Sequence, residues 1–143
     1  MFSDEDRVFI DRHRIAHLAT ADAAAAPHVI PICYALTGDT FYVVIDDKPK
    51  RTRTGLKRLR NIEANPQVAL VIDDYDDDWT RLAYLLVRGR AAVVETEAEY
   101  TRGLAALRAR YPQYRAMSLA LATHPMLRIV AERHHFWHAA AAR

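Results

Sequence analysis

The chain has 143 residues but only one cysteine, four glycines and a formal net charge of +2. A single cysteine, Cys33, excludes an internal disulfide and a cysteine-based zinc site. No apolar run is long enough to span a bilayer, and the N-terminus is too acidic for a secretory signal. We therefore expect a cytoplasmic protein without a membrane partner, folded as a single domain over residues 1–143.

The familiar catalytic loops are also missing. The sequence contains no GxGxxG, GxxxxGK[ST] or GxSxG motif, and no nucleophile–base pair stands out. Two histidine pairs have the spacing of helical metal ligands, His13 with His17 and His134 with His138, but they fall at a predicted helix end and in a predicted strand. We predict no metal site. If the protein is an enzyme, a bound cofactor carries the reactive atom.

Positive charge is concentrated in one segment. Between Lys48 and Arg60 lie seven lysines and arginines and no acidic residue. Residues Gly55–Ala64, which overlap the end of this segment, have the pattern of a short amphipathic helix. Its apolar positions are Leu56, Leu59 and Ile62. Guanidinium groups and the N–H groups of a helix start both bind phosphate oxygens, so the segment is either an anion site or the solvated face of a helix.

Nucleic acid is the second possible ligand of this basic segment, because several cations could neutralise several phosphates. However, no aromatic residue lies between Tyr42 and Tyr75, so the segment offers no surface on which bases could stack. No nucleic-acid-binding module is visible either. We therefore expect no nucleic-acid partner.

Turn signals separate short runs of β-branched and aromatic residues. The predicted strands are Ile15–Thr20, His28–Leu36, Thr40–Ile45, Gln67–Asp73, Leu82–Glu95 (a strand pair, or one bent strand with a bend or bulge at Arg88–Arg90) and Met126–Trp137. The predicted helices are Ser3–Arg14, Gly55–Ala64, a helix from Thr96 that ends at Pro112, and Tyr114–Thr123. This order predicts a mainly β fold, an antiparallel barrel or sandwich with flanking helices.

Two residues are unusual in this pattern. Pro31 lies in the middle of a predicted strand and cannot donate to a ladder, so it belongs on an edge, at a bulge or against a ligand. Trp79 ends an acidic run, Asp73–Asp78, that we expect to be a solvated turn. A large aromatic is costly to expose there, so we expect it to pack on something, with a second subunit as one possibility.

Three stretches together resemble one family. The segment Arg58–Pro66, followed by the strand Gln67–Asp73, resembles the signature of the pyridoxamine 5'-phosphate oxidase-like flavin-binding split barrels. The sequences IAHLATAD and PHVIPICYAL resemble the family's first hairpin. Residues Asp46–Trp79 look most like the actinobacterial branch that binds the deazaflavin coenzyme F420.

The resemblance implies a homodimer of FMN-binding-like split β-barrels with two cofactor sites at the interface. It assigns the cofactor's phosphate end to Lys50, Arg51, Lys57 and Arg58, with Arg60 and Asn61 nearby. It places the ring along Val29, Ile30, Pro31 and Ile32, and lets Trp79 reach the partner's cofactor. The family's spacing between basic loop and helix is shorter than here, so the choice between Lys50 and Lys57 for the phosphate contact stays open.

The function implied is an F420-dependent oxidoreductase that transfers a hydride between the cofactor and a small organic substrate. The additional cations Lys48 and Arg53 suit the longer anionic tail of F420 better than the compact phosphate of FMN. An FMN-dependent oxidase or reductase and a non-catalytic cofactor-binding protein are the alternatives. The proton donor stays open among Tyr34, Tyr84 and His28.

Overall fold

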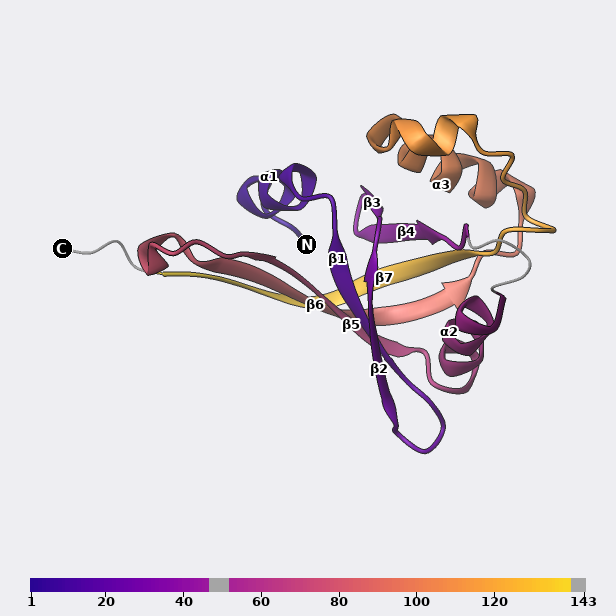
Figure 1. Cartoon of the computed structure of the whole chain (residues 1–143), viewed down its shortest axis with the longest axis horizontal. Coiled ribbons are helices and arrows are strands. Elements are labelled where there is room, and N and C mark those ends of the chain that lie inside the picture. The colour runs from indigo at the N-terminus through magenta and orange to yellow at the C-terminus, as the bar shows by residue number, and fades with distance from the viewer. Residues whose placement is uncertain (47–51, 140–143) are drawn as a thin grey trace.

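The computed structural model describes residues 1–46 and 52–139, without the side chains of residues 52–56. The elements are α1 (Asp4–Arg12), β1 (Ala16–Ala21), β2 (Pro27–Ile32), β3 (Ala35–Thr37), β4 (Thr40–Val44), α2 (Thr52–Ala64), β5 (Gln67–Asp74), η2 (Trp79–Arg81), β6 (Ala83–Val93), α3 (Glu97–Arg110), η3 (Pro112–Ala116) and β7 (Met126–His138). Seven of these described elements form one antiparallel sheet in the order β2-β1-β5-β6-β7-β4-β3 (Figure 1). The mainly β expectation is confirmed.

The sheet curls because its two edge strands are neighbours in sequence. β2 and β3 lie at opposite edges, yet only Cys33 and Tyr34 join them. Since consecutive Cα atoms are about 3.8 Å apart, this link holds the two edges within about 11 Å of each other. The sheet is therefore a curled half-barrel, as in split-barrel folds. The prediction of one strand over His28–Leu36 is wrong at this link, whereas Pro31 lies on an edge strand as expected.

The burial of Tyr34 explains why the strand predicted over His28–Leu36 is interrupted between β2 and β3. Its side chain is fully buried, and its hydroxyl donates to the carbonyl oxygen of Ile10 at 2.7 Å. Its backbone N–H donates to the hydroxyl of Tyr111 at 3.0 Å instead of to a neighbouring strand. The chain consequently leaves the β2 ladder at Cys33 and turns its next side chain into the core.

The inner face of the sheet holds the main core. Alternate residues of the strands point inward, and Leu18, Leu70 and Leu85 are almost fully buried there. Helix α1 closes one end, where Phe9 packs edge-on against Phe136 with ring centroids 5.0 Å apart. Helix α3 covers β3 and β4 with a second apolar cluster, in which Leu107 is fully buried.

The predicted helices are confirmed in part. Ser3 caps α1 by accepting from the N–H of Asp6, and α3 ends just before Pro112. Helix α2 begins at Thr52, three residues before the predicted start. The predicted helix Tyr114–Thr123 is wrong, because Arg108 binds the carbonyl oxygens of Tyr114 and Met117 and so holds η3 and the turn after it in place.

β6 is one bent strand, and its pairing with β7 shifts between Arg88 and Gly89, where Glu132 of β7 is the extra residue of a bulge. The sequence was compatible with a strand pair or with one bent strand over this region, and the structure contains one bent strand. Beyond the half-barrel, the ends of β5, β6 and β7 extend as an arm away from α2 and α3 (Figure 1). No helix within the described ranges is both long and apolar enough to cross a bilayer.

Candidate functional site

The outer face of edge strand β2 is open to solvent. Val29 is 65% exposed and Pro31 is also exposed, whereas Ile32 is only 4% exposed. Ile30 is partly buried and packs against the core. Because side chains alternate along a strand, only Val29 and Pro31 can offer side chains to a ring on the outside. Ile30 and Ile32 support this platform from within.

Helix α2 is fixed against β1, the strand that pairs with β2. Asn61 is 3% exposed and its amide donates to the hydroxyl of Thr20 at 3.2 Å. In the β1–β2 register Thr20 lies opposite His28, the residue before Val29. Ile62 of the same helix lies in the main core. These contacts hold the helix at a fixed place relative to the outer platform on β2.

The predicted phosphate residues have different environments. Lys57 and Arg60 are exposed on α2, whereas Arg58 is buried to 9% exposure. The charge of Lys57 is therefore mobile in solvent, whereas the charge of Arg58 is held in place. Lys57 lies in the second turn of the helix and not at its first residues, since α2 begins at Thr52. Lys50 and Arg51 lie outside the described residues, as does the side chain of Arg53.

A pocket of about 460 Å³ opens at the far end of β2. The residues that line it include Cys33, Asp46, Arg14, Tyr114 and Met117. Its walls are mostly apolar, with charged groups of both signs. This composition suits a small organic molecule that carries a polar group.

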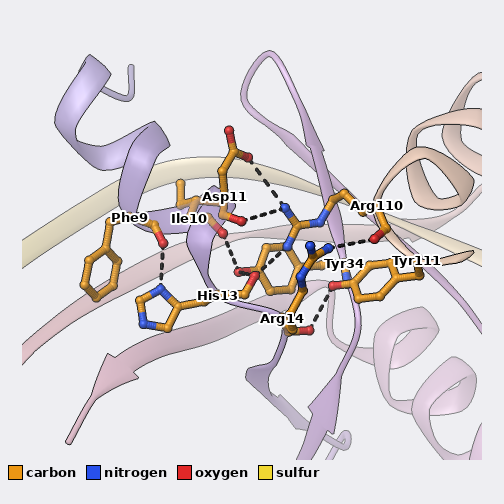
Figure 2. Close-up of polar contacts among 8 residues, drawn as sticks. All are labelled: Phe9, Ile10, Asp11, His13, Arg14, Tyr34, Arg110 and Tyr111. Carbon is orange, nitrogen blue, oxygen red and sulfur yellow. Dashed lines mark hydrogen bonds and ion pairs between the residues drawn. The ribbon is translucent and has the colours of Figure 1, made fainter. Parts of the chain in front are cut away.

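A network of polar contacts holds the wall of this pocket rigid (Figure 2). The guanidinium of Arg110 stacks over the ring of Tyr34, 4.9 Å from its centroid, and donates to the carbonyl oxygen of His13. The hydroxyl of Tyr111 donates to the carbonyl oxygen of Arg14 at 2.8 Å. Sequence reasoning did not find this network, because α3 and the α1–β1 link are distant in the chain and neither carries a motif.

The thiol and the two phenols at this pocket stay protonated at neutral pH. Burial raises the pKa of the Cys33 thiol, and a hydrogen bond from Tyr114 only partly offsets this. Burial likewise raises the pKa of the Tyr34 and Tyr114 hydroxyls. Cys33 is therefore no thiolate nucleophile. Tyr34 is also a poor proton donor, since its hydroxyl is buried and already bound to Ile10.

The two other proton-donor candidates differ in accessibility. His28 has a buried Nδ1 without a hydrogen-bond partner in the described part of the chain. Tyr84 lies on the arm and stacks on Trp137 with ring centroids 5.6 Å apart. Trp79, in η2 at the tip of the arm, is 68% exposed, so its own chain covers little of it. Nowhere in residues 1–46 and 52–139 do three metal-binding side chains gather.

A curled antiparallel half-barrel of seven strands with flanking helices is a split-barrel fold. The family model described as pyridoxamine 5'-phosphate oxidase matches residues 2–138, and the chain belongs to this family. No curated protein matches the sequence.

Solved structures share the fold at low sequence identity. An FAD-binding protein of Mesorhizobium loti aligns with TM-score 0.69 and 18% identity, over 95% of this chain and 94% of its own. A conserved hypothetical protein of Mycobacterium tuberculosis aligns with TM-score 0.72 and 22% identity, over 96% and 86%. The heme storage protein HutZ of Vibrio cholerae aligns with TM-score 0.68 and 19% identity, over 94% and 92%. At these identities the likeness establishes the fold alone.

Proposed function

We propose that the protein is an oxidoreductase that holds a flavin-type cofactor against the outer face of β2, with F420 as the preferred cofactor and FMN as the alternative. The observation that carries this proposal is the exposed apolar platform of Val29 and Pro31, together with a cationic helix that is fixed against the neighbouring strand β1. An apolar platform suits a planar ring, and the exposed Lys57 suits its phosphate.

The chain's own residues bind and orient, and the cofactor when bound supplies hydride chemistry. Val29 and Pro31 contact one face of the ring, while the core residues on the other face of the strand hold it in place. Lys57 and Arg58 offset the phosphate charge. The pocket between Cys33 and Asp46 gives a second reactant a place at the end of the ring strand, where orientation lowers the barrier of a bimolecular step.

F420 is favoured over FMN by the amount of positive charge. The segment from Lys48 to Arg60 carries seven cations. This is more than a single phosphate monoester needs, and it matches a phosphodiester that continues into glutamates. The same surplus would bring no benefit to FMN, which ends at its phosphate.

We also propose that a second copy of the chain covers the outer face of the sheet. Small and apolar side chains occupy its centre, namely Ala19, Ala69, Val71 and Leu86, and no helix in the described ranges packs on them. The exposed Trp79 on the arm would then lie against the partner's cofactor. Such a face together with an exposed tryptophan is typical of a protein interface.

The cofactor proposal predicts a specific effect of Lys57→Ala. Fluorescence titration of the wild-type protein with F420 should give micromolar binding, and the variant should bind at least about tenfold more weakly, because it loses a charge-assisted hydrogen bond of about 1.5–3 kcal/mol. Arg102→Ala, an exposed cation on α3, is the matched control and should bind as the wild type. Tighter binding of FMN than of F420 would exclude the F420 assignment, and binding of neither would exclude both.

Heme is a second candidate ligand, because two histidines lie on the same outer face. His17 and His135 belong to one cross-strand row, separated by Val71 and Leu86. HutZ, which shares the fold, is described as a heme storage protein. A Soret band that forms with the wild-type protein but not with His17→Ala or His135→Ala would favour heme over a flavin.

Subunit mixing tests whether Trp79 serves the partner's site. Trp79→Ala and Lys57→Ala should each bind F420 weakly. If the two residues meet across an interface, an equilibrated equimolar mixture should recover about a quarter of the wild-type sites, because half the dimers are mixed and each has one intact site. No recovery in a mixture shown to exchange subunits would mean that Trp79 does not complete the partner's site.

A further inference from the structure

Two histidine–carboxylate pairs hold helix α1 against β5 and β7, two strands of the arm. Near the start of the helix, Nε2 of His134 on β7 lies 2.9 Å from a carboxylate oxygen of Asp6. At the end of the helix, Nε2 of His13 lies 2.5 Å from a carboxylate oxygen of Asp74 on β5. Between the two pairs the helix packs on β7 through an aromatic contact. The position of α1 on the arm therefore depends on the protons of two histidines.

Both ring nitrogens of His13 face oxygen atoms that accept hydrogen bonds and do not donate them. Nδ1 lies 2.6 Å from the carbonyl oxygen of Phe9, and Nε2 lies against the carboxylate of Asp74. A neutral imidazole has one N–H group and one lone pair, whereas the imidazolium has two N–H groups. Only the charged ring can therefore donate to both oxygens. A neutral ring would point its lone pair at one of them.

The carboxylate of Asp74 stays ionised over the range in which histidines titrate. Burial alone would raise the pKa of Asp74, but hydrogen bonds from Arg12 and His13 hold this pKa below its ordinary value. The stability that the carboxylate contributes is therefore lost only when the pH falls through that lowered value. Between about pH 5 and 8 the imidazole is the partner that changes its charge.

The other charged groups on this side of the helix do not replace the charge of the imidazole. Arg12 binds Asp74 as well, but its side chain is 54% exposed, whereas that of His13 is 13% exposed. Exposed ion pairs contribute little to stability because water and salt screen them. His138, a titratable residue of β7 on this side, contacts Phe136. His13 is thus the mostly buried cation of the contact with Asp74.

The pair at the start of α1 does not need a charged ring. Nε2 of His134 lies against Asp6, whose carboxylate also accepts from the N–H group of Ser3. The ring of Phe2 packs on the imidazole. A neutral imidazole with its proton on Nε2 still donates to Asp6. Loss of a proton weakens this pair without breaking its hydrogen bond, so His134 serves as the control for His13.

We propose that His13 is a proton-dependent latch: its imidazolium holds α1 on β5, and the loss of its proton as the pH rises increases the opening of the helix from the arm. The docked helix holds the charged ring, so docking takes up a proton and weakens at higher pH. The neutral ring donates to either Phe9 or Asp74 and gives up the other contact. The latch requires neither a cofactor nor a second copy of the chain, so its test is independent of the proposed function.

The latch is connected to the pocket at the far end of β2. The carbonyl oxygen of His13 accepts from Arg110, which also pairs with Asp11. The hydroxyl of Tyr34 lies 3.1 Å from the same oxygen. The next residue, Arg14, lines the pocket. Opening of α1 at higher pH would therefore loosen this wall of the pocket.

Amide hydrogen exchange followed by mass spectrometry tests the latch. The protection of α1, corrected for the intrinsic exchange rate, reports how often the helix opens. From about pH 6 to about pH 8.5 the wild type should lose at least about tenfold in this protection, because a charge-assisted hydrogen bond is lost. The middle of α3 should keep its protection. His13→Gln should show the lowered protection of α1 already at about pH 6, without a further fall, whereas His134→Gln should keep the tenfold fall.

Nitrogen NMR of the wild-type protein labelled with ¹⁵N-histidine gives a second readout that needs no variant. The ring of His13, assigned through its backbone correlations, should carry protons on both nitrogens at about pH 6. It should lose one of them at higher pH, with the same midpoint as the loss of protection in α1. A shared midpoint would connect the proton of His13 to the opening of the helix.

Four results would overturn the proposal. The protection of α1 in the wild type could be the same at both pH values. The ring of His13 could be neutral at about pH 6. The fall in protection could persist in His13→Gln. It could instead disappear in His134→Gln alone, which would assign the pH dependence to the pair with Asp6.

Discussion

Val29→Glu is expected to weaken cofactor binding at least about 100-fold while the chain stays folded. Val29 is 65% exposed on edge strand β2, so the substitution removes little packing. A ring on this platform would bury the new carboxylate without a partner, and such burial costs about 3 kcal/mol or more. The measurement is the fluorescence titration with F420, and with FMN, described above.

Val8→Glu provides the matched control. Val8 is 64% exposed on α1, so both substitutions add the same charge at the same exposure. Val8→Glu should bind the cofactor as the wild type does, and both variants should unfold within about 1 kcal/mol of the wild type, as surface substitutions on a helix or an edge strand do. Wild-type affinity in Val29→Glu would show that the ring does not lie on β2.

Gly89→Ala is expected to destabilise the chain by about 3 kcal/mol or more. A Cβ atom at Gly89 would lie 2.3 Å from the carbonyl oxygen of Val130. This neighbour is backbone in the paired strand β7, so the clash can be relieved only by opening the ladder at the bulge. The expected cost is at the upper end of the range for overpacked sites. Urea unfolding followed by circular dichroism measures it.

Gly38→Ala separates this clash from the general cost of replacing a glycine. Gly38 has φ +62° in the β3–β4 turn, and a Cβ there would meet no atom within 4 Å. Its replacement should therefore cost only the left-handed backbone strain of about 1–2 kcal/mol. Equal destabilisation of the two variants would contradict the close approach of β6 and β7 at Gly89.

Several features of the structure depend only on a few neighbouring residues. Ser3 followed three residues later by Asp6 forms the capping pair that starts α1. Asp22 and the alanines after it form the turn between β1 and β2, where the Asp22 carboxylate accepts from the N–H groups of Ala24 and Ala26. Pro112 stops α3 because it offers no N–H for the next turn. Each of these outcomes depends on contacts within about one turn of chain.

The error over His28–Leu36 has its cause in distant contacts. The break at Tyr34 depends on Ile10 and Tyr111, and the latter is 77 residues away along the chain. Helix α2 also contacts β1 through Asn61 and Thr20, 41 residues apart. No short window of the sequence contains such pairs. The sequence therefore gave no sign that the strand predicted over His28–Leu36 is interrupted.

The sequence alone therefore determined the mainly β class, the positions of most strands and caps, the concentration of cations before and within α2, and the resemblance to the pyridoxamine 5'-phosphate oxidase family. These follow from local propensity, alternation and motif, which are properties of neighbouring residues. Only the tertiary structure decided that Val29 and Pro31 face outward while Ile30 and Ile32 support them, and that His13 and Asp74 are in contact. Strand order and register are set by packing between distant segments, and they are decided only when the whole sheet closes over its core.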